Sequence, residues 1–338
     1  MKNAGYFIIA GFVLSIGCNN SQQQHLENAI AGTFRFEPVK DWPGLANEYK
    51  LGNPTGIGID TGQNIFVFHR AGREWPLLMP MPKSFITGKT IFMLERQTGK
   101  LLNSWGDGIF IMPHGLTVDR DNNVWVTDVG LHQVFKFSHE GALLMKLGEA
   151  GVAGKDALHF NLPTDVAVAP DGSFYVSDGY GNSRVMKFSP SGKYLLEWGK
   201  KGSGPGEFNI PHAIDLDKKG NVYVADRENS RIQSFDTTGH FIKEWKKKDF
   251  GKIYSVAIGR INSSLTAVDY NTGFFNPKGS DIMVLDSAAN LLTRFGRSGI
   301  NETSVCRYHD IAIDNEESIY VGDILGNTIR KFHKVTVP

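Results

Sequence analysis

The sequence predicts an all-β protein folded as a six-bladed β-propeller. A unit of the form "P-[TH]-x-[hydrophobic]-x-[hydrophobic]-D", followed by "G-x-[hydrophobic]-Y-V-x-D" and "R-[hydrophobic]-x-x-F", recurs with clear spacings of 50 and then 48 residues. Within each copy, apolar residues alternate with period two over about four short segments, as in a propeller blade. The copies begin at or near Pro54, Pro113, Pro163, Pro211, Tyr254 and Tyr308.

Each copy reads as a meander of strands joined by tight turns. In "TDVAVAPDGSFYVSDG", Val166 and Val168 share one face, and Asp171 with Gly172 turns the chain into the next strand. One meander cannot bury both of its faces, so the blades must stack in a ring, and a barrel or sandwich does not explain a period near 50 residues. The last copy, 308–334, supplies only three strands. We expect "TFRFEPV" at 33–39 to add the fourth and close the ring.

Composition excludes one class of partner and supports a globular fold. The 338 residues are 41% hydrophobic and carry a net charge of +1, so there is no electrostatic case for binding nucleic acid. The densest basic run, 246–248, is typical of a solvated surface.

The N-terminus reads as a targeting segment. Lys2 precedes an apolar run that ends in "LSIGC", which resembles the lipobox of bacterial lipoproteins, although Ser15 stands where an aliphatic residue is usual. We expect a signal peptide over 1–18, lipidation of Cys18, a tether over 19–30 and the propeller over 31–338. The protein would then be exported and lipid-anchored to a bacterial membrane, on its periplasmic or cell-surface side. The alternative is an ordinary cleaved signal.

Histidines recur at one position of the repeat. The residue that opens the innermost strand alternates between a small hydroxyl residue and histidine, in the order Thr55, His114, Thr164, His212, Ser255 and His309. In a six-bladed ring, three imidazoles from alternate blades converge on the axis, as in zinc sites that keep one position open for substrate. Any one histidine at a strand start is more often structural. Asp310 could orient an imidazole, hold a second cation or end the strand.

The loops after the second strands lie at the same mouth as these histidines. Blade one has His69 and Arg70 there, in place of the usual aspartate, blade three has Tyr180, and blade four has Arg227. Two arginines and a tyrosine around a metal suit a substrate carboxylate and a general base, although each of them alone could be a surface residue. The repeated aspartates read as structural acceptors for backbone donors in the following turn: Asp128, Asp178, Asp226 and Asp323.

Two resemblances follow from these motifs. The blades resemble the NHL repeat over almost all of the chain after the targeting segment. The chain also resembles the peptidyl-α-hydroxyglycine α-amidating lyase (peptidylamidoglycolate lyase) family. The motifs that carry this resemblance, in order, are "VFHR" at 67–70, "PHGL" at 113–116, "VTDVGLHQVFK" at 126–136, "PTDVAV" at 163–168, "SDGYGNSR" at 177–184, "ADRENSRIQ" at 225–233 and "HDIA" at 309–312.

The resemblance to the lyases implies a reaction and its cofactors. It implies catalytic Zn²⁺ on the three histidines named above, and structural Ca²⁺ on Asp310 with the backbone carbonyls of Ile57 and Leu116. Tyr180 would remove the substrate hydroxyl proton beside Arg70, Arg227 would shape the site, and a carbon–nitrogen lyase reaction would release a peptide amide and glyoxylate.

The substrate implied is a small molecule or peptide with a terminal carboxylate, and we expect a monomer that meets the membrane only through its lipid. Two departures from the animal lyases matter. Gly181 stands where they have a cysteine, so packing alone would hold the tyrosine loop, and the sequence contains no copper monooxygenase domain. Two alternatives stay open: a non-catalytic NHL propeller that binds a protein or glycan at the cell surface, and a calcium-dependent lactonase-type hydrolase.

Overall fold

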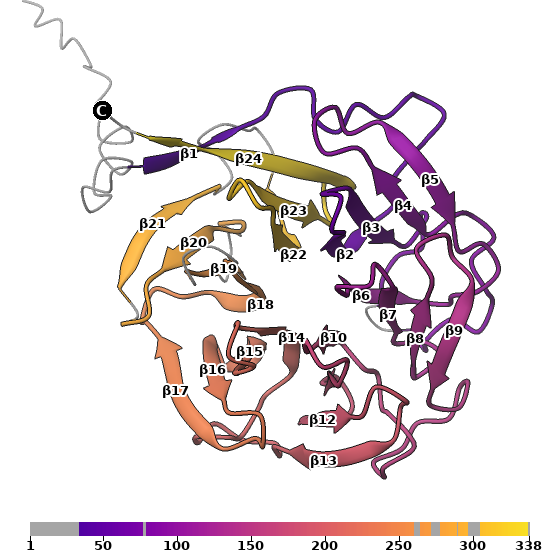
Figure 1. Ribbon diagram of the computed structural model, residues 1–338, viewed down its shortest axis with the longest axis vertical. Helices are drawn as coiled ribbons and strands as arrows, with labels where there is room; N and C mark the ends of the chain where they lie inside the picture. The colour runs from indigo at the N-terminus through magenta and orange to yellow at the C-terminus, as the bar shows by residue number, and fades with distance from the viewer. Residues whose placement is uncertain are drawn as a thin grey trace, which may run out of the picture.

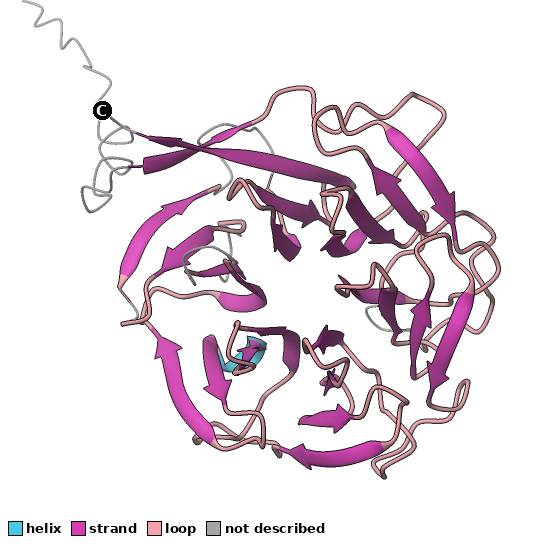
Figure 2. Ribbon diagram, viewed as in Figure 1, coloured by secondary structure: helices cyan, strands magenta, loops and turns pink. Residues whose placement is uncertain are grey.

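The predicted six-bladed propeller is confirmed. The computed structural model describes residues 34–76, 79–259, 264–271, 278–288, 290–296 and 305–336. Six four-stranded antiparallel sheets surround a central axis (Figure 1). Figure 2 shows these residues as strands and loops, with a short helical turn at η3 (Arg227–Asn229). No helix in the described ranges has the length and apolar character needed to cross a membrane. The predicted signal peptide, Cys18 and tether lie outside the described residues.

The strands of each blade run outward from the axis in chain order, except in the last blade. Blade one contains β2 (Pro54–Ile59), β3 (Ile65–His69), β4 (Ile91–Leu94) and β5 (Leu101–Trp105). Blade two contains β6 (Pro113–Val118), β7 (Val124–Asp128), β8 (Gln133–Phe137) and β9 (Leu143–Leu147). Blade three contains β10 (Asp165–Val168), β11 (Phe174–Asp178), β12 (Arg184–Phe188) and β13 (Tyr194–Trp198).

The second half of the chain repeats this order. Blade four contains β14 (Pro211–Leu216), β15 (Val222–Asp226), β16 (Arg231–Phe235) and β17 (Phe241–Lys246). Blade five contains β18 (Lys252–Ile258), β19 (Leu265–Tyr270), β20 (Ile282–Leu285) and β21 (Leu291–Phe295). Blade six contains β22 (Tyr308–Ile313), β23 (Ile319–Asp323), β24 (Thr328–Thr336) and β1 (Phe34–Pro38).

The N-terminal strand closes the ring as expected. β1 pairs antiparallel with β24, with Phe36 opposite Lys334, and the two ends of the described chain lie side by side in Figure 1. The ring of Phe36 also stacks on Phe295 of blade five at 4.9 Å. Closure therefore joins two chain segments and ties them to the neighbouring blade.

The hydrophobic core lies between adjacent blades. Trp125 of blade two packs against Phe174 of blade three, with ring centroids 4.5 Å apart, and both are buried. The outer strands bury much less, and β9 is largely exposed. Stacking of blades therefore buries the faces that a single meander leaves open, as the repeat predicts.

The repeated aspartates are structural, but most of their backbone donors lie elsewhere than predicted. Asp226 accepts hydrogen bonds from the backbone N–H of Asn209 at 2.7 Å and from Arg231 Nε at 2.7 Å. The same pattern holds for Asp178, with Asn161 and Arg184 as donors. All four carboxylates accept from the segment before the inner strand of their own blade, and only Asp128 and Asp323 also accept from backbone N–H groups of the following turn. They tie the loops at the axial mouth to the blades.

Candidate metal centre and anion site

The structure brings the three repeat histidines together. His114, His212 and His309 are each the second residue of an inner strand, and each is at most 4% exposed. Their ring centroids lie 4.7 to 4.8 Å apart, and one nitrogen of each lies within 4.8 Å of the others. The inner strands that carry them surround the axis in Figure 1.

Backbone carbonyls of the other three blades fix which imidazole nitrogen faces inward. The Nδ1 atom of His114 lies 2.6 Å from Thr164 O, and that of His212 lies 2.6 Å from Tyr254 O. The Nδ1 atom of His309 lies 2.9 Å from Thr55 O. A carbonyl only accepts, so each Nδ1 carries the proton and each Nε2 keeps its lone pair.

The three imidazoles are neutral at ordinary pH. Burial lowers the pKa of His114, His212 and His309 well below 6.5, and nearby positive charge on Arg227 adds to this. Three neutral nitrogen donors with fixed tautomers fit a borderline divalent ion such as zinc. The residues present therefore fit the metal that the sequence resemblance implies.

Tyr180 lies against this cluster. Its hydroxyl is 3.1 Å from Nε2 of both His114 and His212, and Arg227 Nη1 donates a hydrogen bond to it at 3.2 Å. Burial raises the pKa of Tyr180, while the charges of Arg227 and Arg70 oppose the rise. The tyrosine is thus held where a proton on a ligand at the histidines would be within reach.

The loop that carries Tyr180 is held by hydrogen bonds as well as packing, which corrects the expectation from sequence. Gly181 N–H donates to Asn161 O at 2.9 Å, and a Cβ at Gly181 would lie 2.1 Å from Asn161 Cγ. Asn182 Nδ2 donates to Asp178 Oδ2 at 2.7 Å. A larger residue at position 181 would require the Asn161 side chain to move.

Arg227 belongs to a chain of polar contacts that sequence reasoning missed. Its Nε donates to Glu228 Oε1 at 3.0 Å, and Lys252 Nζ lies 2.6 Å from Glu228 Oε2. The guanidinium carbon lies 5.2 Å from the Tyr180 ring centroid and 5.1 Å from that of Tyr254. Glu228 follows directly after Arg227 in "ADRENSRIQ", so the motif could have indicated an ion pair between these two residues.

Arg70 reaches the same mouth with few partners. It is 2% exposed, and the one hydrogen bond of its side chain within the described ranges runs from Nε to Pro113 O at 3.2 Å. Burial lowers its pKa to about 10, so it stays charged at neutral pH. Its guanidinium carbon lies 5.2 Å from the ring centroid of Trp75. Trp75 was not identified from sequence; it lies on the connection 70–90 between β3 and β4, which has no counterpart of similar length in blades two to four and six.

His69 takes the place of the repeated aspartate in blade one. Its Nδ1 accepts backbone N–H groups of Gly52 at 3.2 Å and Ala71 at 3.1 Å. Its Nε2 is buried without a hydrogen-bond partner, and the ring meets Phe92 edge-on with centroids 4.5 Å apart. Burial lowers its pKa to about 3. His69 therefore does what the aspartates do in other blades, but without a charge.

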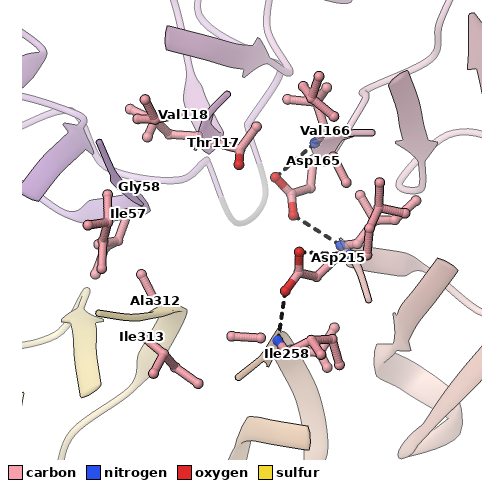
Figure 3. Close-up of a pocket in the computed structure, with 18 of the residues that line it drawn as sticks. Ile57, Gly58, Thr117, Val118, Asp165, Val166, Asp215, Ile258, Ala312 and Ile313 are labelled. Atoms are coloured by element: carbon pink, nitrogen blue, oxygen red, sulfur yellow. Dashed lines mark hydrogen bonds between the residues drawn. The ribbon is translucent and has the colours of Figure 1, made fainter. Parts of the chain in front are cut away.

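A second cavity lies at the other end of the inner strands, with a volume of about 250 Å³. Asp310, Ile57 and Leu116 line it, as do carboxylates not assigned from sequence, among them Asp165 and Asp215. Figure 3 shows Asp165 and Asp215 in this cavity, each bonded to backbone N–H groups of the strands. Each carboxylate accepts an N–H from the next blade around the ring.

The side-chain atoms that could bind a cation at this end of the strands are carboxylate oxygens. Asp310 Oδ1 accepts from Ser255 Oγ at 2.6 Å, and Asp310 Oδ2 accepts from Ile57 N–H at 2.7 Å. The pKa of Asp310 is raised to about 6, mainly by burial and in the same direction by the neighbouring charge of Asp215. Buried carboxylates that repel one another fit a hard cation such as calcium, which would offset both costs.

Fold and repeat define the class of the protein. A family model described as "6-bladed beta-propeller" matches residues 155–289, and the NHL repeat model matches residues 110–137. The chain is a six-bladed β-propeller with NHL-type repeats.

Relatives with similar sequences include enzymes of one group. The chain is 38% identical over 326 residues to peptidyl-glycine alpha-amidating monooxygenase B of Xenopus laevis, a match covering 90% of this chain and 36% of the relative. It is 39% identical over 225 residues to a probable peptidyl-alpha-hydroxyglycine alpha-amidating lyase of Caenorhabditis elegans, covering 62% of this chain and 63% of the relative. The chain thus spans about a third of the length of the first of these relatives.

Solved structures share the fold at low identity. A gluconolactonase from Xanthomonas campestris superposes with a TM-score of 0.59 at 13% identity, covering 85% of this chain and 88% of the other. Virginiamycin B lyase from Staphylococcus aureus gives a TM-score of 0.55 at 14% identity, covering 89% and 99%. These likenesses support the fold alone.

Proposed function

We propose that the protein is a metal-dependent carbon–nitrogen lyase that cleaves a C-terminal hydroxyglycine-type carbinolamide to an amide and glyoxylate. The observation that carries this proposal is one mouth that holds three inward Nε2 lone pairs, the Tyr180 hydroxyl, the buried guanidinium of Arg70 and the partly exposed guanidinium of Arg227. Similarity to relatives named as amidating lyases supports the same reaction.

The chemistry can be assigned to residues of this chain. A cation on the three histidines, together with the charge of Arg227, would oppose the burial that raises the pKa of Tyr180 and would favour its phenolate. Tyr180 in that form takes the proton of the substrate hydroxyl. The electron pair of that O–H bond forms the aldehyde C=O bond as the C–N bond breaks. The pair released from the C–N bond stays on nitrogen, which takes up one proton, so the products are the amide and glyoxylate. Arg70 binds the substrate carboxylate, and Arg227 holds the Tyr180 oxygen and favours its ionised form.

Two metals accompany the proposal. Zinc on His114, His212 and His309 would supply Lewis-acid polarisation of a substrate oxygen. Calcium on Asp310 with the carbonyls of Ile57 and Leu116 would be structural. We also propose export, a lipid anchor at Cys18 and a monomeric state, for which the amino-acid sequence is the support.

The proposal is tested with purified protein and a synthetic peptidyl-hydroxyglycine, following glyoxylate release and the metal content. We expect about one zinc per chain and a loss of at least roughly 100-fold in rate on His114→Ala, together with loss of that zinc. His240→Ala is the matched control, because this histidine is 83% exposed at its side chain. Zinc-loaded protein that releases no glyoxylate would remove the substrate assignment. Metal content unchanged by His114→Ala would favour a non-catalytic binding propeller.

A further inference from the structure

Three arginines in the described ranges are almost completely buried, Arg70, Arg184 and Arg231, and two of them use all of their side-chain donors. Arg184 donates to Asp178, to Glu197 and to three backbone carbonyls, and Arg231 has the equivalent five bonds in blade four. Arg227 pairs with Glu228. Arg70 is as buried as Arg184 and Arg231, yet within the described ranges its side chain donates one hydrogen bond and has no carboxylate within ion-pair distance. Glu74 and Asp128 act on its charge only from further away.

The indole of Trp75 lies against the Arg70 guanidinium, whereas Arg227, at the same repeat position in blade four, has Glu228 as an acidic partner. The Arg70 guanidinium carbon lies over the indole at 5.2 Å. The same indole packs on Tyr180, with centroids 5.0 Å apart and ring planes inclined at 36°. Trp75 is half-buried and rests on the apolar cluster shared by blades one and two. It is therefore in contact with both groups that the proposed reaction needs.

An indole and a carboxylate stabilise a buried cation in different ways. A carboxylate forms a bidentate pair that uses the edge of the guanidinium, so an incoming anion would have to displace it. An indole attracts the cation through its face, keeps water away and leaves the donor edge free. The charge of Arg70 thus stays available to a ligand.

We propose that Trp75 is a positioning residue that holds Arg70 desolvated and without a competing acid, so that the site selects ligands with a terminal carboxylate. This inference rests on the proposed function and goes beyond it, because it assigns the selectivity for the carboxylate to an aromatic residue outside the repeat. His69 acts in the same direction, since blade one carries this neutral acceptor where the other blades mostly carry aspartate.

The test uses two unreactive probes, N-acetyl-alanyl-glycine and its C-terminal amide, titrated into the zinc-loaded full chain by calorimetry. The wild type should bind the acid more tightly than the amide. Trp75→Leu should weaken binding of the acid by roughly 3- to 30-fold, the range expected for a desolvated cation–π contact, and leave the amide unchanged. Trp75→Phe keeps an aromatic face and should recover part of the difference. Phe85→Ala, at an exposed position on the same connection, is the matched control and should change neither affinity.

The outcomes separate this inference from the proposed function. If the wild type binds the acid more tightly than the amide and Trp75→Leu keeps the same ratio of affinities, the role of Trp75 is overturned and the proposed function still stands. Equal binding of both probes by the wild type would count against both. Thermal unfolding and zinc content report whether Trp75→Leu is folded. If it is not, the partial loss expected for Trp75→Phe decides, and an unchanged preference in that variant would refute the proposal.

Discussion

At the scale of single residues, the protonation state of the site histidines is set by blades other than their own. Each Nδ1–H donates to a carbonyl at or next to the hydroxyl residue of a neighbouring blade, for example His309 to Thr55 O. The alternation of histidine and small hydroxyl residues seen in the sequence therefore has two halves. The blades with a histidine supply the Nε2 atoms that face the axis and could bind a metal. The blades with a hydroxyl residue supply the backbone carbonyls that accept a hydrogen bond from each Nδ1–H and so orient the imidazoles.

We expect His69 to make the free energy of unfolding sensitive to acid. Its pKa is about 3 in the folded chain, against about 6.5 when exposed, so the unfolded state binds the extra proton between these values. The stabilisation is complete above pH 6.5 and is lost as the pH falls toward 3, at about 1.4 kcal/mol per pH unit for one proton. His69→Asn keeps an acceptor for Gly52 and Ala71 but does not titrate.

The measurement is the free energy of unfolding from denaturant titrations at pH 7, 6, 5 and 4. We expect the wild type to lose more stability over this range than His69→Asn. The two curves should differ in slope by about 1.4 kcal/mol per pH unit, because unfolding of the wild type takes up one additional proton. Parallel curves for the two proteins would show that His69 is not a neutral buried acceptor.

At the scale of strands and loops, one arginine in each of blades three and four attaches the loop that leads into the inner strand. In blade three, Arg184 of β12 binds the carbonyls of Lys155, Asp156 and His159, and its Nε donates to Asp178 of β11. This loop continues to Thr164, whose carbonyl accepts from His114. The recurring "R-[hydrophobic]-x-x-F" of the sequence is thus a loop anchor that leads to the metal centre.

Arg184→Met should destabilise the protein strongly. It removes five buried hydrogen bonds and leaves Asp178 without its cation, a change that costs about 3 to 5 kcal/mol when one partner of a buried pair is lost. Lys187→Met is the control on the same strand, because Lys187 binds Thr237 O at an exposed position and should cost under about 1 kcal/mol. Denaturant unfolding compares the two. Equal small losses would mean that the arginine is not an anchor.

At the scale of the whole molecule, the number of blades, the closing strand and the three histidines could be predicted because each follows from the repeat. Asp165 shares the repeat position of Asp310, so the sequence contained a signal for it that went unused. Asp215 lies two residues further along its strand, and the period-two alternation places it on the same face, so it lines the same cavity. Trp75 lies on a connection outside the repeat, so no register could place it over Arg70.

Ring closure by β1 makes a prediction about the intact propeller. Five residue pairs join β1 to β24, and Phe36 adds a stacked contact with Phe295. A chain that begins at residue 39 would lose both and expose the β24 edge, which invites pairing with another molecule. We expect a loss of about 3 kcal/mol or more, a fall in Tm of roughly 5 to 10 °C, and association that increases with concentration. A chain that begins at residue 33 keeps β1 and is the control. Calorimetric unfolding and size-exclusion chromatography measure both effects, and a shorter chain that stays monomeric with an unchanged Tm would show that the ring does not depend on this strand.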